Sequence, residues 1–249
     1  MSRRSGRIPH LLGLARPQPE SDLCWLARKC HKEFWGGGDA RWRGMFAAPF
    51  EEMSVAFANI DRSVGRHEVL AMAAGLHQEF SHYCAFADAY DAIKPAGQAG
   101  VDPANLKDQS WPENDALSTL RVTHRERYGD IGRRAHRFTE GGYCGLFREG
   151  KKLAERCAAD DAIAAACALV YGDEFEHMLA GIAGLTQGGF SPTDWTLLGE
   201  LTTAQMRQRI HMRNAQFGTP LPEARVAKIL AGAIAPVAFD YELAARLLV

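Results

Sequence analysis

Two long stretches of the sequence, residues 66–93 and 161–185, each carry an apolar stripe at helical spacing that a glutamate and a histidine interrupt. The interrupting pairs are Glu79 with His82 and Glu174 with His177. A buried carboxylate is costly unless it binds a metal or pairs with an opposite charge. The chain is therefore expected to fold so that two long helices direct their carboxylates toward a shared cation.

The spacing within each pair supports a metal site. Glu-x-x-His places the two side chains on one face of a helix and one turn apart, so an oxygen and an imidazole nitrogen can reach the same ion. One such pair is a weak signal, because isolated pairs are common on solvated helices. Two pairs in apolar stripes are far more specific, and a two-metal bundle then requires one glutamate from each of two further helices at the same height.

The position of one of these further glutamates can be predicted from the antiparallel geometry of two helices joined by a turn. In an antiparallel helix pair, residues at equal height are equidistant from the turn. Glu140 and Glu174 are equidistant from Cys157, which lies beside the turn expected at residues 158–160. We therefore predict that Glu140 faces Glu174 from a helix that covers residues 132–157.

Three residues are candidates for the glutamate that faces Glu79. A turn near Gly65 points to Glu51 or Glu52, and Glu52 is preferred because it lies nearer the apolar stripe of its own helix. Glu33 is the third choice, because its midpoint with Glu79 would fall inside a helix.

The other segments predict further helices. Residues 20–35 form a short N-terminal helix, Pro and Gly in residues 94–112 indicate a long connection, and Pro220 and Pro222 divide the C-terminal part into two helices. No convincing strand pattern appears, so we expect an all-α fold with a four-helix bundle and a long crossover. The expected organisation is an N-terminal arm and helix in 1–48, a two-metal bundle in 49–185, and a C-terminal helical extension in 186–249.

Composition excludes some classes of protein. Lys and Arg (29) balance Asp and Glu (30), and the net charge of -1 disfavours a nucleic-acid binder. The six cysteines form no Cys-x-x-Cys pair, which disfavours a disulfide framework or a zinc site and fits a reducing cytoplasm. The longest apolar run is far shorter than the roughly 18 residues of a membrane span. We expect a cytoplasmic protein that does not enter a membrane.

These motifs resemble the ligand set of the ferritin-like di-iron carboxylate superfamily over about residues 49–185. The Asp-Glu-x-x-His form that starts at Asp173 is similar to ribonucleotide reductase small subunits and bacterial multicomponent monooxygenases, whereas Gln78 stands at the equivalent place in the first motif. The resemblance implies a ferritin-like bundle with two iron ions, or manganese, bridged by Glu79 and Glu174. The implied ligands are Glu52, Glu79, His82, Glu140, Glu174 and His177.

The same resemblance implies roles for neighbouring residues and for the protein. Asp173 would steady a ligand histidine without binding metal itself, and Tyr83 and Tyr143 are candidates for a radical or proton relay, although ordinary core tyrosines are the alternative. The implied function is a dioxygen-dependent oxidase or oxygenase that hydroxylates, N-oxygenates or desaturates a small organic molecule, as a homodimer supplied by an electron-donor protein. The alternatives are a ferroxidase or iron store, a tRNA-modifying di-iron hydroxylase, and a metal-free structural bundle.

Overall fold

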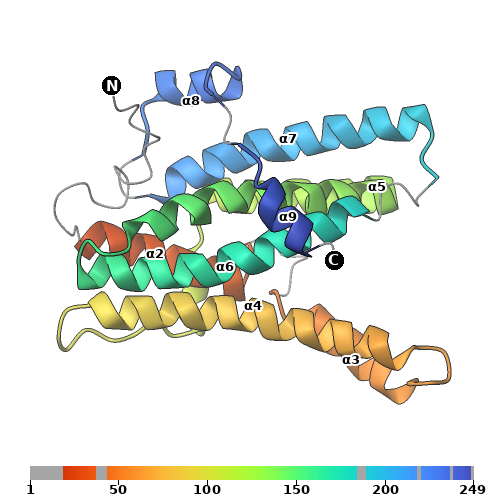
Figure 1. Ribbon diagram of the computed structural model, residues 1–249, viewed down its shortest axis with the longest axis horizontal. Helices are drawn as coiled ribbons and strands as arrows, with labels where there is room; N and C mark the ends of the chain where they lie inside the picture. Colours follow the sequence, from red (N-terminus) through yellow and green to blue (C-terminus); the bar gives the residue numbers. More distant parts are fainter. Residues whose placement is uncertain (1–18, 38–43, 184–188, 218–219, 236–237, 248–249) are drawn as a thin grey trace.

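Helices make up most of the part of the chain that the computed structural model describes, and loops and turns connect them (Figure 1). The described residues are 19–37, 44–183, 189–217, 220–235 and 238–247, with the backbone alone in 19, 140–143 and 180–183. Within them no strand forms, and the one β-type contact is an isolated bridge between Ile60 and Val64. The prediction of an all-α fold is confirmed. No helix in these ranges has both the length and the apolar character to cross a membrane.

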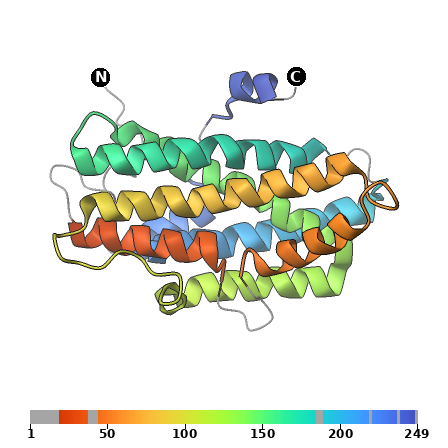
Figure 2. The same cartoon turned by 90° about the horizontal axis from the view of Figure 1, so that it is seen from below.

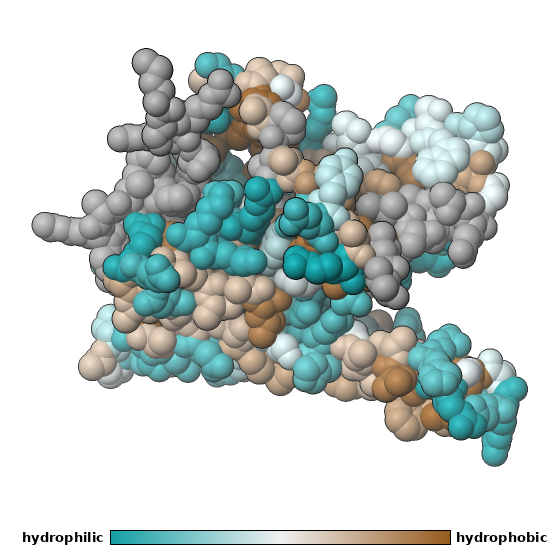
Figure 3. Space-filling model, viewed as in Figure 1, coloured by the Kyte–Doolittle hydropathy of each residue, from teal (hydrophilic) through white to brown (hydrophobic). Residues whose placement is uncertain are grey.

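Two shorter helices pack one after the other along a third, longer helix. Helix α2 (Pro19–Phe34) and helix α3 (Ala47–Ala58) both pack on helix α4 (Arg66–Ile93). The end of α2 meets the start of α3, where the rings of Phe34 and Phe46 lie 5.6 Å apart. The N-terminal helix, which was expected outside the bundle, therefore lies along the second half of α4. The first half of α4 projects with α3 as an arm from the body of the molecule (Figures 1 and 3).

Helix α5 (Pro112–Gly150) folds back on itself at Gly129, whose φ of 55° and ψ of -120° are open to glycine alone without strain. The two halves then pack side by side. Gly132 lies so near the backbone of His124 that a Cβ there would be 2.1 Å from the His124 carbonyl oxygen. Figure 2 shows the first half along one edge and the second half returning through the middle. The helix expected over 132–157 is therefore the second half of a longer, reversed element.

Helix α6 (Ala158–Ala183) packs against both α4 and α5. A 3-10 turn (Lys151–Leu153) and residues 154–157 connect α5 to α6, so the turn lies earlier than the expected 158–160. The two long helices of this hairpin remain antiparallel neighbours, as the symmetry argument required. The helix predicted from Arg66 to Ile93 has the bounds that the sequence indicated.

The C-terminal helices lie on the outside of this assembly. Helix α7 (Pro192–Gln216) starts with a capping box, in which the Ser191 hydroxyl accepts from the Asp194 backbone and the Asp194 carboxylate accepts from the Ser191 backbone. It packs along α5. Helix α8 (Glu223–Leu230) contacts α7, and the short helix α9 (Tyr241–Leu247) contacts α6.

The centre of the molecule is filled by large rings from three helices. Trp25 of α2 meets Phe86 of α4 edge-on at 5.7 Å, and Phe86 lies 6.0 Å from Phe147 of α5. The buried ammonium group of Lys29 is 4.7 Å from the centre of both phenylalanine rings and donates to Glu33. A buried lysine is stable only with such partners. This core therefore holds a charged pair on the inner face of α2, next to α4.

Candidate metal centre

Three side chains with metal-binding atoms converge beside this core. Glu33 comes from the last turn of α2, and Glu79 and His82 come from the middle of α4. One ligand atom from each lies within 4.8 Å of the others, and Glu33 and His82 are only 5% and 0% exposed. Two carboxylates and an imidazole in a buried position are suitable ligands for a divalent transition metal.

His82 is oriented by a carboxylate from the neighbouring helix. Its Nε2 lies 3.0 Å from Oδ2 of Asp173 on α6. An ionised carboxylate can only accept, so Nε2 carries the hydrogen and Nδ1 has the lone pair. His82 Nδ1 is buried, faces Glu79 Oε2 at 3.7 Å and has no hydrogen-bond partner among the described residues. A buried lone pair that faces a carboxylate needs a group between the two, and a cation or an ordered water has the required chemistry.

His177 of α6 faces the same glutamate from the other side. Its Nδ1 lies 3.9 Å from Glu79 Oε1, and its Nε2 lies 3.1 Å from the Gln78 side-chain oxygen. The centres of the His82 and His177 rings are 6.5 Å apart. One oxygen of Glu79 therefore faces His82 of α4, and the other faces His177 of α6. A carboxylate that bridges two ions has this arrangement.

In each motif, the residue before the glutamate contacts the histidine of the other motif. Asp173 precedes the glutamate of the second motif and bonds to His82 of the first. Gln78 precedes the glutamate of the first motif and bonds to His177 of the second. The predicted contact of Asp173 with a histidine on a neighbouring helix is present, and its effect on metal chemistry stays a prediction. The partner role of Gln78 was not foreseen.

Glu33 is kept ionised despite its burial. Burial by itself raises the pKa of Glu33, but the charges of Lys29 and Lys32, together with that of His82 when its ring is protonated, outweigh burial and hold the pKa below its ordinary value. The ammonium group of Lys29 binds Oε1, so Oε2 is the oxygen that can reach a metal. Glu33 is thus a charged ligand candidate at neutral pH.

Glu174 lies inside the helix assembly, at 6% exposure. Burial, and next the charge of Glu174, raise the pKa of Cys144 on α5 to about 12. Glu174 is therefore close to the face of α5 that carries Cys144, and Glu140 lies one helical turn earlier on that face. The side chains of Glu140 and Tyr143 lie outside the described part of the structure. Their predicted roles stay predictions.

Glu51 and Glu52 do not reach this cluster, because both are exposed on α3. The reason is the length of α3. It begins at Ala47, and Phe46, the residue before it, already lies opposite Phe80 at a ring distance of 5.7 Å. The height of Glu79 therefore corresponds to the start of α3, beyond Glu52. At that height α2, and not α3, is the neighbour of α4. The structure therefore places Glu33, the third choice, beside Glu79.

A sequence signal for Glu33 did exist. The buried residues Leu23, Leu26 and Cys30 are spaced by three and four positions, and Glu33 continues that stripe. The same argument identified the other two motif helices, and it would have identified α2 as the helix that borders the site.

Tyr83 lies next to the cluster in an aromatic group. Its ring is 5.3 Å from Phe34 and 5.8 Å from Phe80, and burial raises the pKa of Tyr83. These contacts are those of a packed core tyrosine with a stable phenol. A relay role for Tyr83 stays a prediction.

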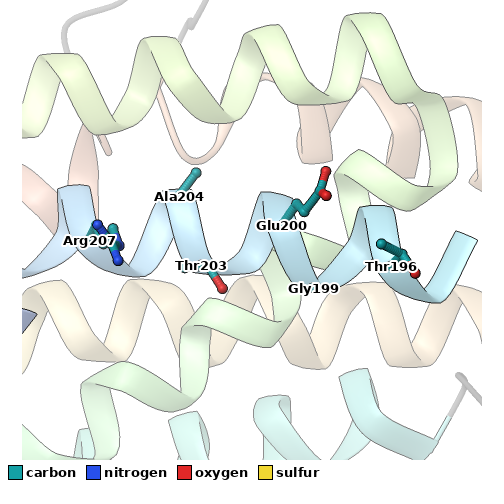
Figure 4. Close-up of a pocket in the computed structure, with 6 residues that line it drawn as sticks. All are labelled: Thr196, Gly199, Glu200, Thr203, Ala204 and Arg207. Atoms are coloured by element: carbon teal, nitrogen blue, oxygen red, sulfur yellow. The ribbon is translucent and has the colours of Figure 1, made fainter. Parts of the chain in front are cut away.

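A surface hollow on α7 is separate from these residues. Six residues of that one helix line it, and none is a histidine or cysteine. Figure 4 shows them on α7 alone: Thr196, Gly199, Glu200, Thr203, Ala204 and Arg207. A shallow hollow formed by a single helix lacks the converging polar groups of a binding site.

Comparison with known proteins adds no family: no family model matches the sequence, and no curated protein or solved structure matches it either. The functional argument therefore depends on the arrangement of the residues described above.

Proposed function

We propose that the chain is a ferritin-like two-metal carboxylate protein that uses dioxygen to oxidise a small organic molecule. In this proposal α2, α4, the second half of α5, and α6 form the four-helix bundle, and residues 94–111 with the first half of α5 form the crossover. The observation that carries the proposal is Glu79, whose two oxygens face His82 and His177 from two helices at 3.7 and 3.9 Å.

The residues at the centre fit a pair of iron or manganese ions. Mixed carboxylate and imidazole ligands are typical of these metals, and a glutamate from each of two helices with Glu-x-x-His from two others is the known ligand pattern of such bundles. The proposed ligands are Glu33, Glu79, His82, Glu140, Glu174 and His177. When bound, two adjacent redox-active ions would supply two of the four electrons that reduction of dioxygen to water requires, and oxidation of the organic substrate would supply the other two.

The protein's own residues prepare the site for this chemistry. Asp173 and Gln78 fix the tautomers and ring orientations of the two histidines through their Nε2 hydrogens. The buried charge of Lys29 partly balances the carboxylates and keeps Glu33 ionised. The buried rings of Phe86 and Phe147 flank the ammonium group of Lys29 and shield the Lys29–Glu33 pair from water, and oxidising species are longer-lived in a dry cavity.

A dioxygen assay tests this function. Apoprotein loaded with ferrous ion under nitrogen should consume dioxygen when air is admitted, and no iron mineral should form. Size-exclusion chromatography should show a small oligomer, with a homodimer as our expectation. A many-chain hollow assembly that accumulates iron mineral would instead identify a ferroxidase or iron store. Failure of the loaded protein to react with dioxygen would overturn the oxidase proposal.

The Asp173→Asn variant tests the orientation of His82. The amide keeps the shape of the side chain but removes the charge that accepts the His82 hydrogen, so we expect a folded protein that retains most of its metal. Its reaction with dioxygen should be slower by roughly 10–100-fold, the usual effect of losing such a partner. Stopped-flow absorption after mixing with dioxygen measures this rate. A wild-type rate would show that Asp173 serves helix packing alone.

A further inference from the structure

We infer that the two metal positions are built to be unequal, so that the first ion binds on the His82 side and the second binds more weakly on the His177 side. This inference rests on the proposed function, because it concerns the same centre. It identifies Gln78 as the positioning residue for the weaker side. Three features of the described residues support it.

The first feature is the chemistry of the two hydrogen-bond acceptors. His82 donates to the carboxylate of Asp173, whereas His177 donates to the neutral amide oxygen of Gln78. A hydrogen bond to an ionised acceptor is roughly twice as strong as one between neutral groups. A carboxylate also makes the ring that donates to it a more basic metal ligand. The Nδ1 atom of His82 is therefore the stronger ligand of the two.

The second feature is exposure to solvent. The His82 side chain is 0% exposed, whereas 23% of the His177 side chain is accessible. Water screens the attraction between an ion and its ligands, and this screening is weaker at a buried position. The same ion should thus be held more tightly beside His82.

The third feature is the degree of preassembly. On the His82 side, Glu33 and Glu79 already present oxygens within 4.8 Å of the imidazole. On the His177 side, Glu79 Oε1 is the one carboxylate oxygen for which the described residues give a contact with the ring, at 3.9 Å. A preassembled set of ligands loses less conformational entropy when an ion binds.

Lys29 acts in the opposite direction, because its ammonium group lies next to Glu33 and repels a cation. Its hydrogen bond to Glu33 goes to Oε1, however, so the charge of Glu33 and its second oxygen remain available to a cation. The lysine therefore weakens the first position without occupying its ligand. The carboxylate of Asp173, the burial of His82 and the preassembled ligands all favour binding of the first ion on the His82 side.

Cobalt(II) titration of the apoprotein tests the inference, because cobalt absorption reports the geometry of each occupied position and calorimetry gives both affinities. We expect two separate binding steps in the wild type. Asp173→Asn should weaken the first step by about tenfold, which still leaves most of the metal bound at saturating concentrations, and should leave the second step nearly unchanged. Gln78→Glu, which places a carboxylate under His177, should tighten the second step by up to about tenfold and leave the first nearly unchanged.

A control separates hydrogen bonding from general charge. His77→Glu adds a negative charge at an exposed position next to Gln78 on α4, and it should tighten neither step by more than about twofold, as screened surface charges do. Equal changes in His77→Glu and Gln78→Glu would overturn the role of Gln78. Two equal affinities in the wild type would overturn the inequality and leave the metal centre standing. No cobalt binding at all would overturn the proposed centre itself.

Discussion

Replacing His82 with alanine should remove most of the iron that the protein retains after purification. Its Nδ1 is buried, lies 3.7 Å from Glu79 Oε2 and has no hydrogen-bond partner among the described residues. Without it, the first ion would be held by carboxylates alone, and at least a 100-fold loss of affinity is expected, more than the roughly 10–100-fold loss caused by removing an outer partner. His177→Ala should weaken binding of the second ion by a similar mechanism.

His77→Ala is the matched control for these variants. His77 lies on the same helix, but its side chain is exposed, so its removal should leave the metal content unchanged. Metal content is measured by elemental analysis, and circular dichroism confirms that each variant is folded. Full occupancy and an unchanged iron spectrum in both His82→Ala and His177→Ala would show that the two histidines do not bind metal.

The second large effect is a loss of metal affinity that should follow the substitution of one glutamate but not of another. Glu33→Gln should lower metal affinity strongly, because it removes a charged, buried ligand that lies with Glu79 and His82. Glu52→Gln should have no effect, because Glu52 is exposed on α3. The two substitutions change the same atoms, so the comparison isolates position. Isothermal titration with ferrous ion under nitrogen measures both affinities.

Glu33→Gln also affects stability. It removes the carboxylate that accepts from the buried Lys29, and breaking a buried ion pair typically destabilises by about 3–5 kcal/mol. A double variant that adds Lys29→Met restores a neutral pair and should recover much of the unfolding free energy without recovering metal. If metal affinity returns with stability, or if Glu52→Gln is the variant that loses metal, Glu33 is not the ligand.

The sequence predicted those features of the site that lie within one helix. Glu79 with His82 and Glu174 with His177 stand in apolar stripes, and helical periodicity is a local property that can be counted directly. The helix of residues 66–93 was placed correctly for the same reason. The all-α fold follows from the sum of such local patterns.

Relations between helices were harder to predict. The choice of Glu52 assumed that α3 is long enough to reach the height of Glu79, and the start of α3 at Ala47 depends on how α2 and α3 share α4. The pairing of Gln78 with His177 depends on the rotation of α6 relative to α4, which no single helix encodes. The reversal at Gly129 was missed because the sequence analysis placed no helix between residue 112 and residue 132, where the first half of α5 lies.

The most direct test of the central claim is the metal content of the purified protein. Protein from cells grown with added iron should contain about two metal ions per chain, the number that two Glu-x-x-His helices and two further carboxylates hold in such bundles. Inductively coupled plasma mass spectrometry, combined with amino-acid analysis for the protein concentration, measures this ratio. Binding of about two ions per chain, lost in the His82→Ala protein, is the predicted result. A protein that contains no iron or manganese, and that takes up neither when the apoprotein is incubated with the ferrous or manganous ion, would contradict the account.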